Sequence, residues 1–233
     1  SNGHRNTRWR SPWSMPPGTT FFTLDVSDVL DYAAGRVASA AEAQRLFEAT
    51  VPDGDLRRAL LAWHGQSRTG QPGLSAASVG RGVAKFWRAL DALAVLAEHI
   101  RARRRGQPFD LELSIDEVPS GIPVGDVLST ADEVAFLLGE IRRRGLPVSH
   151  LAPNLGVEKG TDYRLADGLA GLERRTRGLQ RLLQAAEVML DCHSGDDLTA
   201  PTRRVVGRAT DGQVHFKISP SLQVLFAEVL QAE

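Results

Sequence analysis

The stretch FDLELSID, residues Phe109–Asp116, decides the fold class of this chain. Its apolar residues Leu111, Leu113 and Ile115 alternate with polar ones, which is the period-two pattern of a strand with one apolar and one polar face. A long helical pattern precedes this strand and another follows it. Strands that alternate with helices are typical of a parallel sheet covered by helices, so the stretch predicts the α/β class.

The same alternation extends along most of the chain. Five strands are expected, at Phe21–Val26, Phe109–Asp116, Val148–Ala152, Val188–His193 and Val214–Ile218. Helices are expected at Ala40–Thr50, Asp53–His64, Ala76–Arg104, Val127–Arg144, Leu165–Ala186 and Pro220–Leu230. Since a complete (β/α)8 barrel needs eight strands, the pattern predicts TIM-barrel-like (β/α) repeats in a partial or shortened barrel, or an open sheet. Residues 1–20 are expected as a tail, and residues 21–233 as a single barrel-like domain.

Composition excludes several classes of protein. The 233 residues carry 28 basic and 28 acidic side chains, so no overall positive field is present to attract nucleic acid. The single cysteine, Cys192, excludes an intrachain disulfide and a multi-cysteine metal site. No apolar run is long enough to cross a bilayer, and no secretory signal is visible. These features predict a cytoplasmic protein that binds neither nucleic acid nor membrane.

Four of the five expected strands have a polar face. The residues on these faces are Thr23 and Asp25; Glu112, Ser114 and Asp116; Asp191 and His193; and His215 and Lys217. If the apolar faces meet the helices, the polar faces point into a shared centre, where charged groups are costly unless they are paired or bound to metal. Buried structural ion pairs, or edge strands with one wet face, are the alternative. The repetition favours a barrel-like active centre.

Two histidines are candidate metal ligands. His193 and His215 lie on different strands at corresponding depth, which suits a divalent ion held by imidazoles. By contrast, His64, His99 and His150 are expected as ordinary helix or strand residues. Three polar loops follow the strands, at residues 117–125, 153–163 and 194–201. Because strand ends and their loops build the active site in barrels and open α/β sheets, we expect the site there.

Several short motifs, in this order, resemble the tagaturonate epimerase family. They are FFTLDV at 21–26, ELSIDE at 112–117, LAP at 151–153, EKGTDY at 158–163, HSGDD at 193–197 and HFK at 215–217. The resemblance implies a TIM-barrel, metal-dependent epimerase that interconverts tagaturonate and fructuronate. These keto acids differ at a carbinol carbon β to the ketone, so enolisation alone does not invert it. Retro-aldol cleavage followed by re-addition would invert this carbon. A metal would stabilise the enediolate, and an acid/base group would move the hydroxyl proton.

The resemblance also implies roles for individual residues. His193 and His215 would hold a divalent cation, with manganese, zinc, nickel and cobalt all plausible. Glu158 is the first candidate acid/base, and Asp116 and Glu112 are alternatives. The substrate-binding candidates are Lys159, Lys217, Ser194 and Asp197. The small sugar acid is the expected partner, and a homo-oligomer is expected because exposed sheet edges invite pairing.

Two departures from the family motifs support a second hypothesis. The family's Asp-His motif upstream of the first strand has no counterpart in residues 1–20, and Leu198 stands where the family has a cation. A cation beside an anionic substrate contributes binding energy. The alternative function is therefore a non-catalytic, degenerate barrel that binds a sugar acid or a protein partner.

Overall fold

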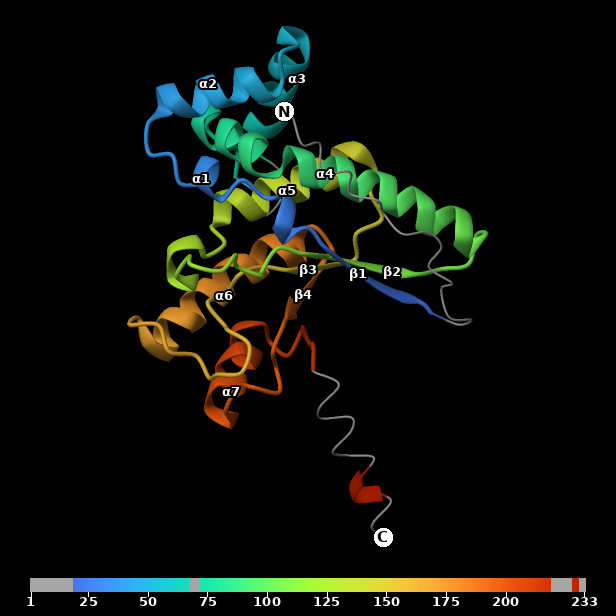
Figure 1. The fold of residues 1–233 in the computed structure, drawn as a ribbon, viewed down its shortest axis with the longest axis vertical. Coiled ribbons are helices and arrows are strands. Elements are labelled where there is room, and N and C mark those ends of the chain that lie inside the picture. The colour runs from blue at the N-terminus through green and yellow to red at the C-terminus, as the bar shows by residue number, and fades with distance from the viewer. Residues whose placement is uncertain (1–18, 68–71, 219–227, 231–233) are drawn as a thin grey trace, which may run out of the picture.

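A five-stranded parallel sheet organises the chain (Figure 1). The computed structural model describes residues 19–67, 72–218 and 228–230. Its strands are β1 (Phe21–Asp25), β2 (Asp110–Ser114), β3 (His150–Ala152), β4 (Met189–Cys192) and β5 (Val214–Phe216). They pair in sequence order, β1-β2-β3-β4-β5, and every pair is parallel. The α/β class, the parallel sheet and the five strands are thus confirmed, although each strand is shorter than expected.

The sheet is strongly curved. In a flat sheet the first and fifth strands would lie about 19 Å apart, because neighbouring strands are about 4.8 Å apart. The ring centroids of Phe21 on β1 and His215 on β5 are nevertheless only 5.3 Å apart, and both rings also contact the ring of His150 on β3. Contact between side chains of the two outer strands is consistent with a partial barrel.

Helices connect the strands and cover the convex face. They are α1 (Tyr32–Gly35), α2 (Ala40–Thr50), α3 (Gly54–Gly65), α4 (Ala76–Arg104), α5 (Ala131–Arg144), α6 (Gly168–Ala185) and α7 (Ala200–Ala209), with 3-10 turns at Ser27–Val29 and Val124–Val127. In Figure 1, α2, α3 and α4 gather on one side of the sheet, and α6 and α7 lie toward the other end. Consecutive strands joined through helices in this way are the (β/α) repeats that the sequence predicts.

Most helix bounds agree with the sequence, and the exceptions have local causes. Helix α5 begins at Ala131 rather than at Val127, because Thr130 and Glu133 form a capping box that fixes the start. Helix α7 was not expected; its signal was Pro201 in the first turn, after Thr199. The last expected helix, Pro220–Leu230, lies largely outside the described residues, which include only its helical end at 228–230.

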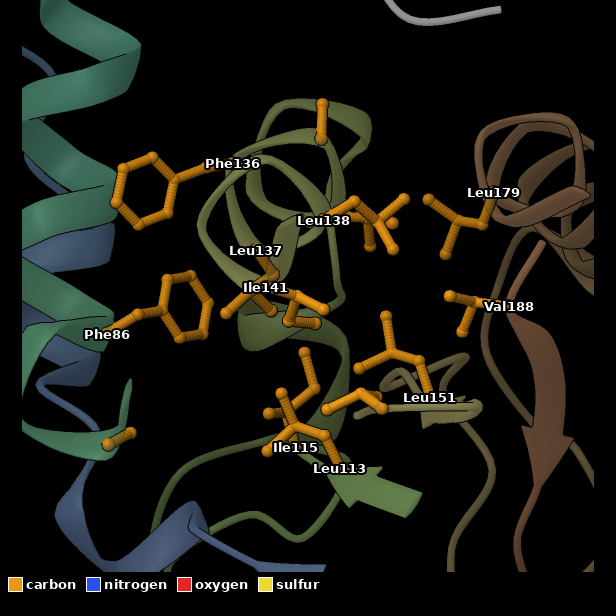
Figure 2. Packing of buried hydrophobic residues seen from close by; sticks show 14 of the residues in the cluster. Phe86, Leu113, Ile115, Phe136, Leu137, Leu138, Ile141, Leu151, Leu179 and Val188 are labelled. Atoms are coloured by element: carbon orange, nitrogen blue, oxygen red, sulfur yellow. The ribbon is translucent and has the colours of Figure 1, made fainter. Parts of the chain in front are cut away.

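The hydrophobic core lies between the sheet and the helices (Figure 2). Leu113, Ile115 and Leu151 of the sheet side face Leu137 and Ile141 of α5, and all five are buried. The apolar faces that the alternation predicts therefore do meet the helices, which leaves the polar faces for the concave side. Within the described part of the chain, no helix is both long and apolar enough to cross a membrane.

Candidate functional site

A polar pocket of about 600 Å³ opens where the loops follow β2, β3, β4 and β5. Residues from all three of the predicted loops line it, together with residues just after β5. Its polar lining includes Asp116, Glu117, Glu158, Lys159, His193, Ser194, Asp196, Asp197 and Lys217. The structure thus brings most of the predicted site residues to one pocket at the carboxyl ends of the strands.

His193 is held between two carboxylates at this pocket. Its Nε2 atom lies 2.7 Å from Glu112 Oε1, and its Nδ1 atom lies 3.0 Å from Asp116 Oδ2. Burial alone would lower the pKa of His193, but hydrogen bonds to Asp116 and Glu112 raise it to about 9. The ring is therefore an imidazolium at neutral pH and donates a hydrogen bond from each nitrogen.

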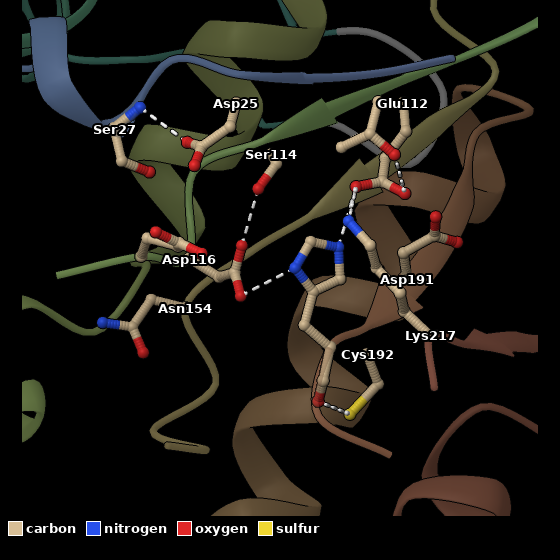
Figure 3. A network of polar contacts seen from close by, with 12 residues as sticks. Asp25, Ser27, Glu112, Ser114, Asp116, Asn154, Asp191, Cys192 and Lys217 are labelled. Atoms are coloured by element: carbon tan, nitrogen blue, oxygen red, sulfur yellow. Dashed lines mark hydrogen bonds and ion pairs between the residues drawn. The ribbon is translucent and has the colours of Figure 1, made fainter. Parts of the chain in front are cut away.

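The two carboxylates differ in their access to the pocket. Glu112 has no exposed side-chain surface, whereas Asp116 is 18% exposed and lines the pocket. The Ser114 hydroxyl donates to Asp116 Oδ1 at 2.7 Å, so Asp116 is oriented from two sides (Figure 3). Burial opposes ionisation of Glu112, but the hydrogen bond from His193 and the charge of Lys217, 3.8 Å away, contribute to holding its pKa at about 2.

Three further side chains form a cluster with metal-ligand chemistry on the concave face. His150, Asp191 and His215 each offer one ligand atom, and these atoms all lie within 4.8 Å of one another. Asp191 has no exposed side-chain surface, and its Oδ2 atom is 3.1 Å from His215 Nδ1. Neither of its carboxylate oxygens has a hydrogen-bond partner of good geometry among the described residues. Burial and the neighbouring Glu112 carboxylate raise the pKa of Asp191 to about 9.

The structure separates the two predicted metal ligands. His215 belongs to the cluster, whereas both nitrogens of His193 face Glu112 and Asp116 instead. His150, expected as an ordinary strand residue, takes the second imidazole position in the cluster. Its signal in the sequence was the alternation of β3, in which His150 and Ala152 share the face opposite to the buried Leu151.

The remaining predicted residues lie at the rim of the pocket. Glu158, the first acid/base candidate, forms an ion pair with Arg164 at 2.8 Å and keeps 33% of its side chain exposed. Asp197 accepts a hydrogen bond from the Gly160 amide at 2.7 Å, which ties two pocket loops together. Lys217 directly follows β5, lines the pocket and has 44% of its side chain exposed.

Comparison with known proteins identifies relatives of this fold. A family model described as tagaturonate epimerase (UxaE) matches residues 12–222. No curated protein matches the chain. Three crystal structures of fructuronate-tagaturonate epimerase UxaE from Cohnella laeviribosi share the fold: the native protein, with TM-score 0.69, and complexes with one and two glycerols, with TM-scores 0.69 and 0.71.

The match covers most of this chain but less than half of each Cohnella laeviribosi structure. Each of these structures is 24% identical to the chain and aligns with 87% or 88% of it. The chain, however, spans only 40% of the length of each structure. The family model covers most of the chain, and by that match the chain belongs to the tagaturonate epimerase family.

Proposed function

We propose that the chain acts in the epimerisation of tagaturonate and fructuronate, or of a closely related keto sugar acid. The observation that carries this proposal is the ion-paired set Glu112–His193–Asp116 at the wall of a polar pocket. Family membership and the epimerase named in the related crystal structures support the same reaction.

Inversion at a carbinol carbon β to the ketone is proposed to proceed by retro-aldol cleavage. A base removes the hydroxyl proton, the carbon–carbon bond between that carbinol and the carbon beside the ketone breaks, and an aldehyde and an enediolate form. Rotation of the aldehyde and re-addition to its other face restores the bond with inverted configuration, and the proton returns to the new hydroxyl. Atoms and electrons balance without an external oxidant or reductant.

Asp116 is the best-placed base for this proton transfer. Of the three candidate carboxylates, Glu112 is fully buried, whereas Glu158 and Asp116 both line the pocket. Glu158 pairs with the exposed Arg164, while Asp116 is less exposed and pairs with His193, whose imidazole can itself exchange a proton. The imidazolium of His193, 3.0 Å from Asp116, would orient this carboxylate. Lys217 and Lys159 are the lysines of the pocket lining and would hold the substrate's carboxylate or hydroxyl oxygens.

Metal dependence is part of this proposal. A divalent cation would supply Lewis-acid stabilisation of the negative charge that develops on the ketone oxygen during cleavage. Its support is the presence of imidazole and carboxylate donors on the concave face, a donor set that suits zinc, cobalt, nickel or manganese.

The experiment is a direct epimerase assay on the full chain. Tagaturonate and fructuronate are each incubated with the protein and added Mn²⁺, Zn²⁺, Ni²⁺ or Co²⁺, and conversion is followed by NMR. We expect turnover in the presence of at least one of these metal ions. In Asp116→Asn we expect kcat to fall by about 100-fold or more. Glu187→Gln, an exposed residue far from this pocket, serves as the matched control.

Binding without turnover is the second candidate function. Its support is a shortage of positive charge for catalysis: the described lining has five carboxylates, namely Asp116, Glu117, Glu158, Asp196 and Asp197, against two lysines and the His193 imidazolium, which disfavours the negative charge that develops during cleavage. Tight binding of a sugar acid in calorimetry, with no conversion in any metal, would establish this function and refute the catalytic one.

We further propose that the protein is cytoplasmic and forms a homo-oligomer. The buried free thiol of Cys192 is compatible with a reducing compartment. Among the described strands, β1 and β5 each have one edge without a pairing strand, and such edges favour association. Light scattering across a range of concentrations tests the oligomer, and a monomer throughout would refute it.

A further inference from the structure

We infer that a single divalent transition-metal ion binds to His150, Asp191 and His215, with His193 outside its coordination shell. This assignment rests on the proposed metal dependence and deepens it, because it keeps His215, drops His193 and adds His150 and Asp191. It rests on where three neighbouring strands place their side chains, and it can be tested without substrate.

The strand register brings the three donors together. Asp191 on β4 pairs directly with His215 on β5, so the two side chains project from adjacent backbones toward the same side. His150 on β3 pairs with Met189, two residues before Asp191, which places His150 on that side as well. The donors therefore come from three consecutive strands of a rigid sheet and not from mobile loops.

The distances fit one ion. Zinc–nitrogen and zinc–oxygen bonds are about 2.1 Å long, so two ligand atoms of one ion lie at most about 4.2 Å apart. The candidate atoms lie within 4.8 Å of one another, and the Asp191–His215 pair is already at 3.1 Å. Closure by about half an ångström, within the reach of side-chain rotation, would complete the site. Three protein ligands leave one coordination position open for water.

The buried side chain of Asp191 is an independent feature that suits a metal ligand. It has no exposed surface, and neither oxygen has a hydrogen-bond partner of good geometry among the described residues. Glu112, its neighbour, is also fully buried. A buried carboxylate is costly unless a positive charge or hydrogen bonds compensate it. An ion between Asp191 and the two imidazoles would compensate this carboxylate directly, in addition to the more distant charges of His193 and Lys217.

His193 is engaged in different contacts. Glu112 and Asp116 bind its two ring nitrogens at 2.7 Å and 3.0 Å, so a metal ion would have to displace one of these charged hydrogen bonds. The position of the Phe21 ring also favours His150 and His215 as the metal ligands. The ring packs edge-on against His150 and His215, with centroids 4.9 Å and 5.3 Å away, and thereby restricts both rings on the concave face.

The test is a Co²⁺ titration of the full chain after chelator treatment, read by visible absorption and by elemental analysis, with Zn²⁺ as the competitor. The variants are His150→Gln, His215→Gln, Asp191→Asn and His193→Gln. His99→Gln, at an exposed position on α4, is the matched control. Loss of outer contacts alone weakens metal sites by about 10- to 100-fold, so loss of a ligand should weaken Co²⁺ binding by about 100-fold or more.

We expect one Co²⁺ per chain in the wild type, in His99→Gln and in His193→Gln, and the 100-fold loss in the other three variants. Thermal unfolding without metal provides the folding control. Asp191→Asn keeps the size of the side chain and replaces a carboxyl group whose ionisation burial and Glu112 already oppose, so it should unfold no earlier than the wild type and its loss of binding cannot be ascribed to misfolding.

Two outcomes overturn the assignment. Absence of stoichiometric Co²⁺ in the wild type, or equal affinity in Asp191→Asn, would exclude the site. Loss of binding in His193→Gln with retention in His150→Gln would replace it by a site that uses His193. Neither outcome depends on turnover, so a protein that binds Co²⁺ as expected but converts no substrate would refute the proposed activity alone.

Discussion

The carboxylate of Glu140 is the clearest electrostatic determinant of stability in this fold. It lies on α5 with no exposed side-chain surface and accepts hydrogen bonds from Arg143 at 2.7 Å, Arg144 at 2.9 Å and His64 at 2.9 Å. Burial would raise the pKa of Glu140, but these bonds outweigh it and hold the pKa at about 2, below the ordinary value of 4.5. The change to test is Glu140→Gln, which keeps the shape and removes the charge.

The loss of stability expected in Glu140→Gln follows from the shift in the pKa of Glu140. A lowering from 4.5 to about 2 corresponds to about 3 kcal/mol of stability, at about 1.36 kcal/mol per unit. Because the folded-state pKa is the lower one, this stability is fully present above about pH 5 and is lost as the pH falls toward 2. At pH 3 the same linkage leaves less than half of this stability. Removing one member of a buried ion pair costs a similar amount, about 3–5 kcal/mol.

Urea unfolding at pH 7 and at pH 3 measures both values. We expect Glu140→Gln to be less stable than the wild type by about 3 kcal/mol at pH 7, and by less than half of that at pH 3. Glu98→Gln, with 73% of the side chain exposed, is the matched control and should change stability by less than about 0.5 kcal/mol. A variant as stable as the wild type at pH 7, or a loss that is equal at both pH values, would refute this account of Glu140.

Other positions give further predictions. Gly82→Ala should destabilise the chain by about 1–3 kcal/mol in urea unfolding, because an added Cβ would lie 2.5 Å from the buried ring of Phe136. Gly178→Ala, where nothing lies within 4 Å, should instead stabilise it by up to about 1 kcal/mol; the same sign for both changes would contradict the packing argument. Burial raises the pKa of Cys192 to about 12, so its thiol should resist a disulfide reagent at pH 8 in the folded chain and react in urea. Rapid reaction in the folded chain would show that this side chain is accessible.

Local pattern was enough to predict most of the secondary structure. Two helices, α2 and α4, begin and end at the residues expected, because each starts after a serine cap and carries regular apolar spacing. The alternation in β2 assigned Leu111 and Leu113 to the buried face and Glu112 to the polar one. Helix caps, apolar spacing and strand alternation depend only on residues that are close in sequence, so one sequence is enough to predict them. Helix α7 is the exception, because a proline that follows a polar, glycine-containing run is as typical of a loop as of the first turn of a helix.

Tertiary structure alone decided which polar residues meet. A period-two pattern assigns a side chain to a face of the sheet but not to a depth along the barrel. Depth depends on the register between strands, which long-range pairing sets. That register places Asp191 opposite His215, so His215 meets Asp191 and His150, while His193, two residues further along the chain and just after β4, meets Glu112. The sequence therefore determined the polar centre and its residue types, and the register determined the two separate groups of contacts within it.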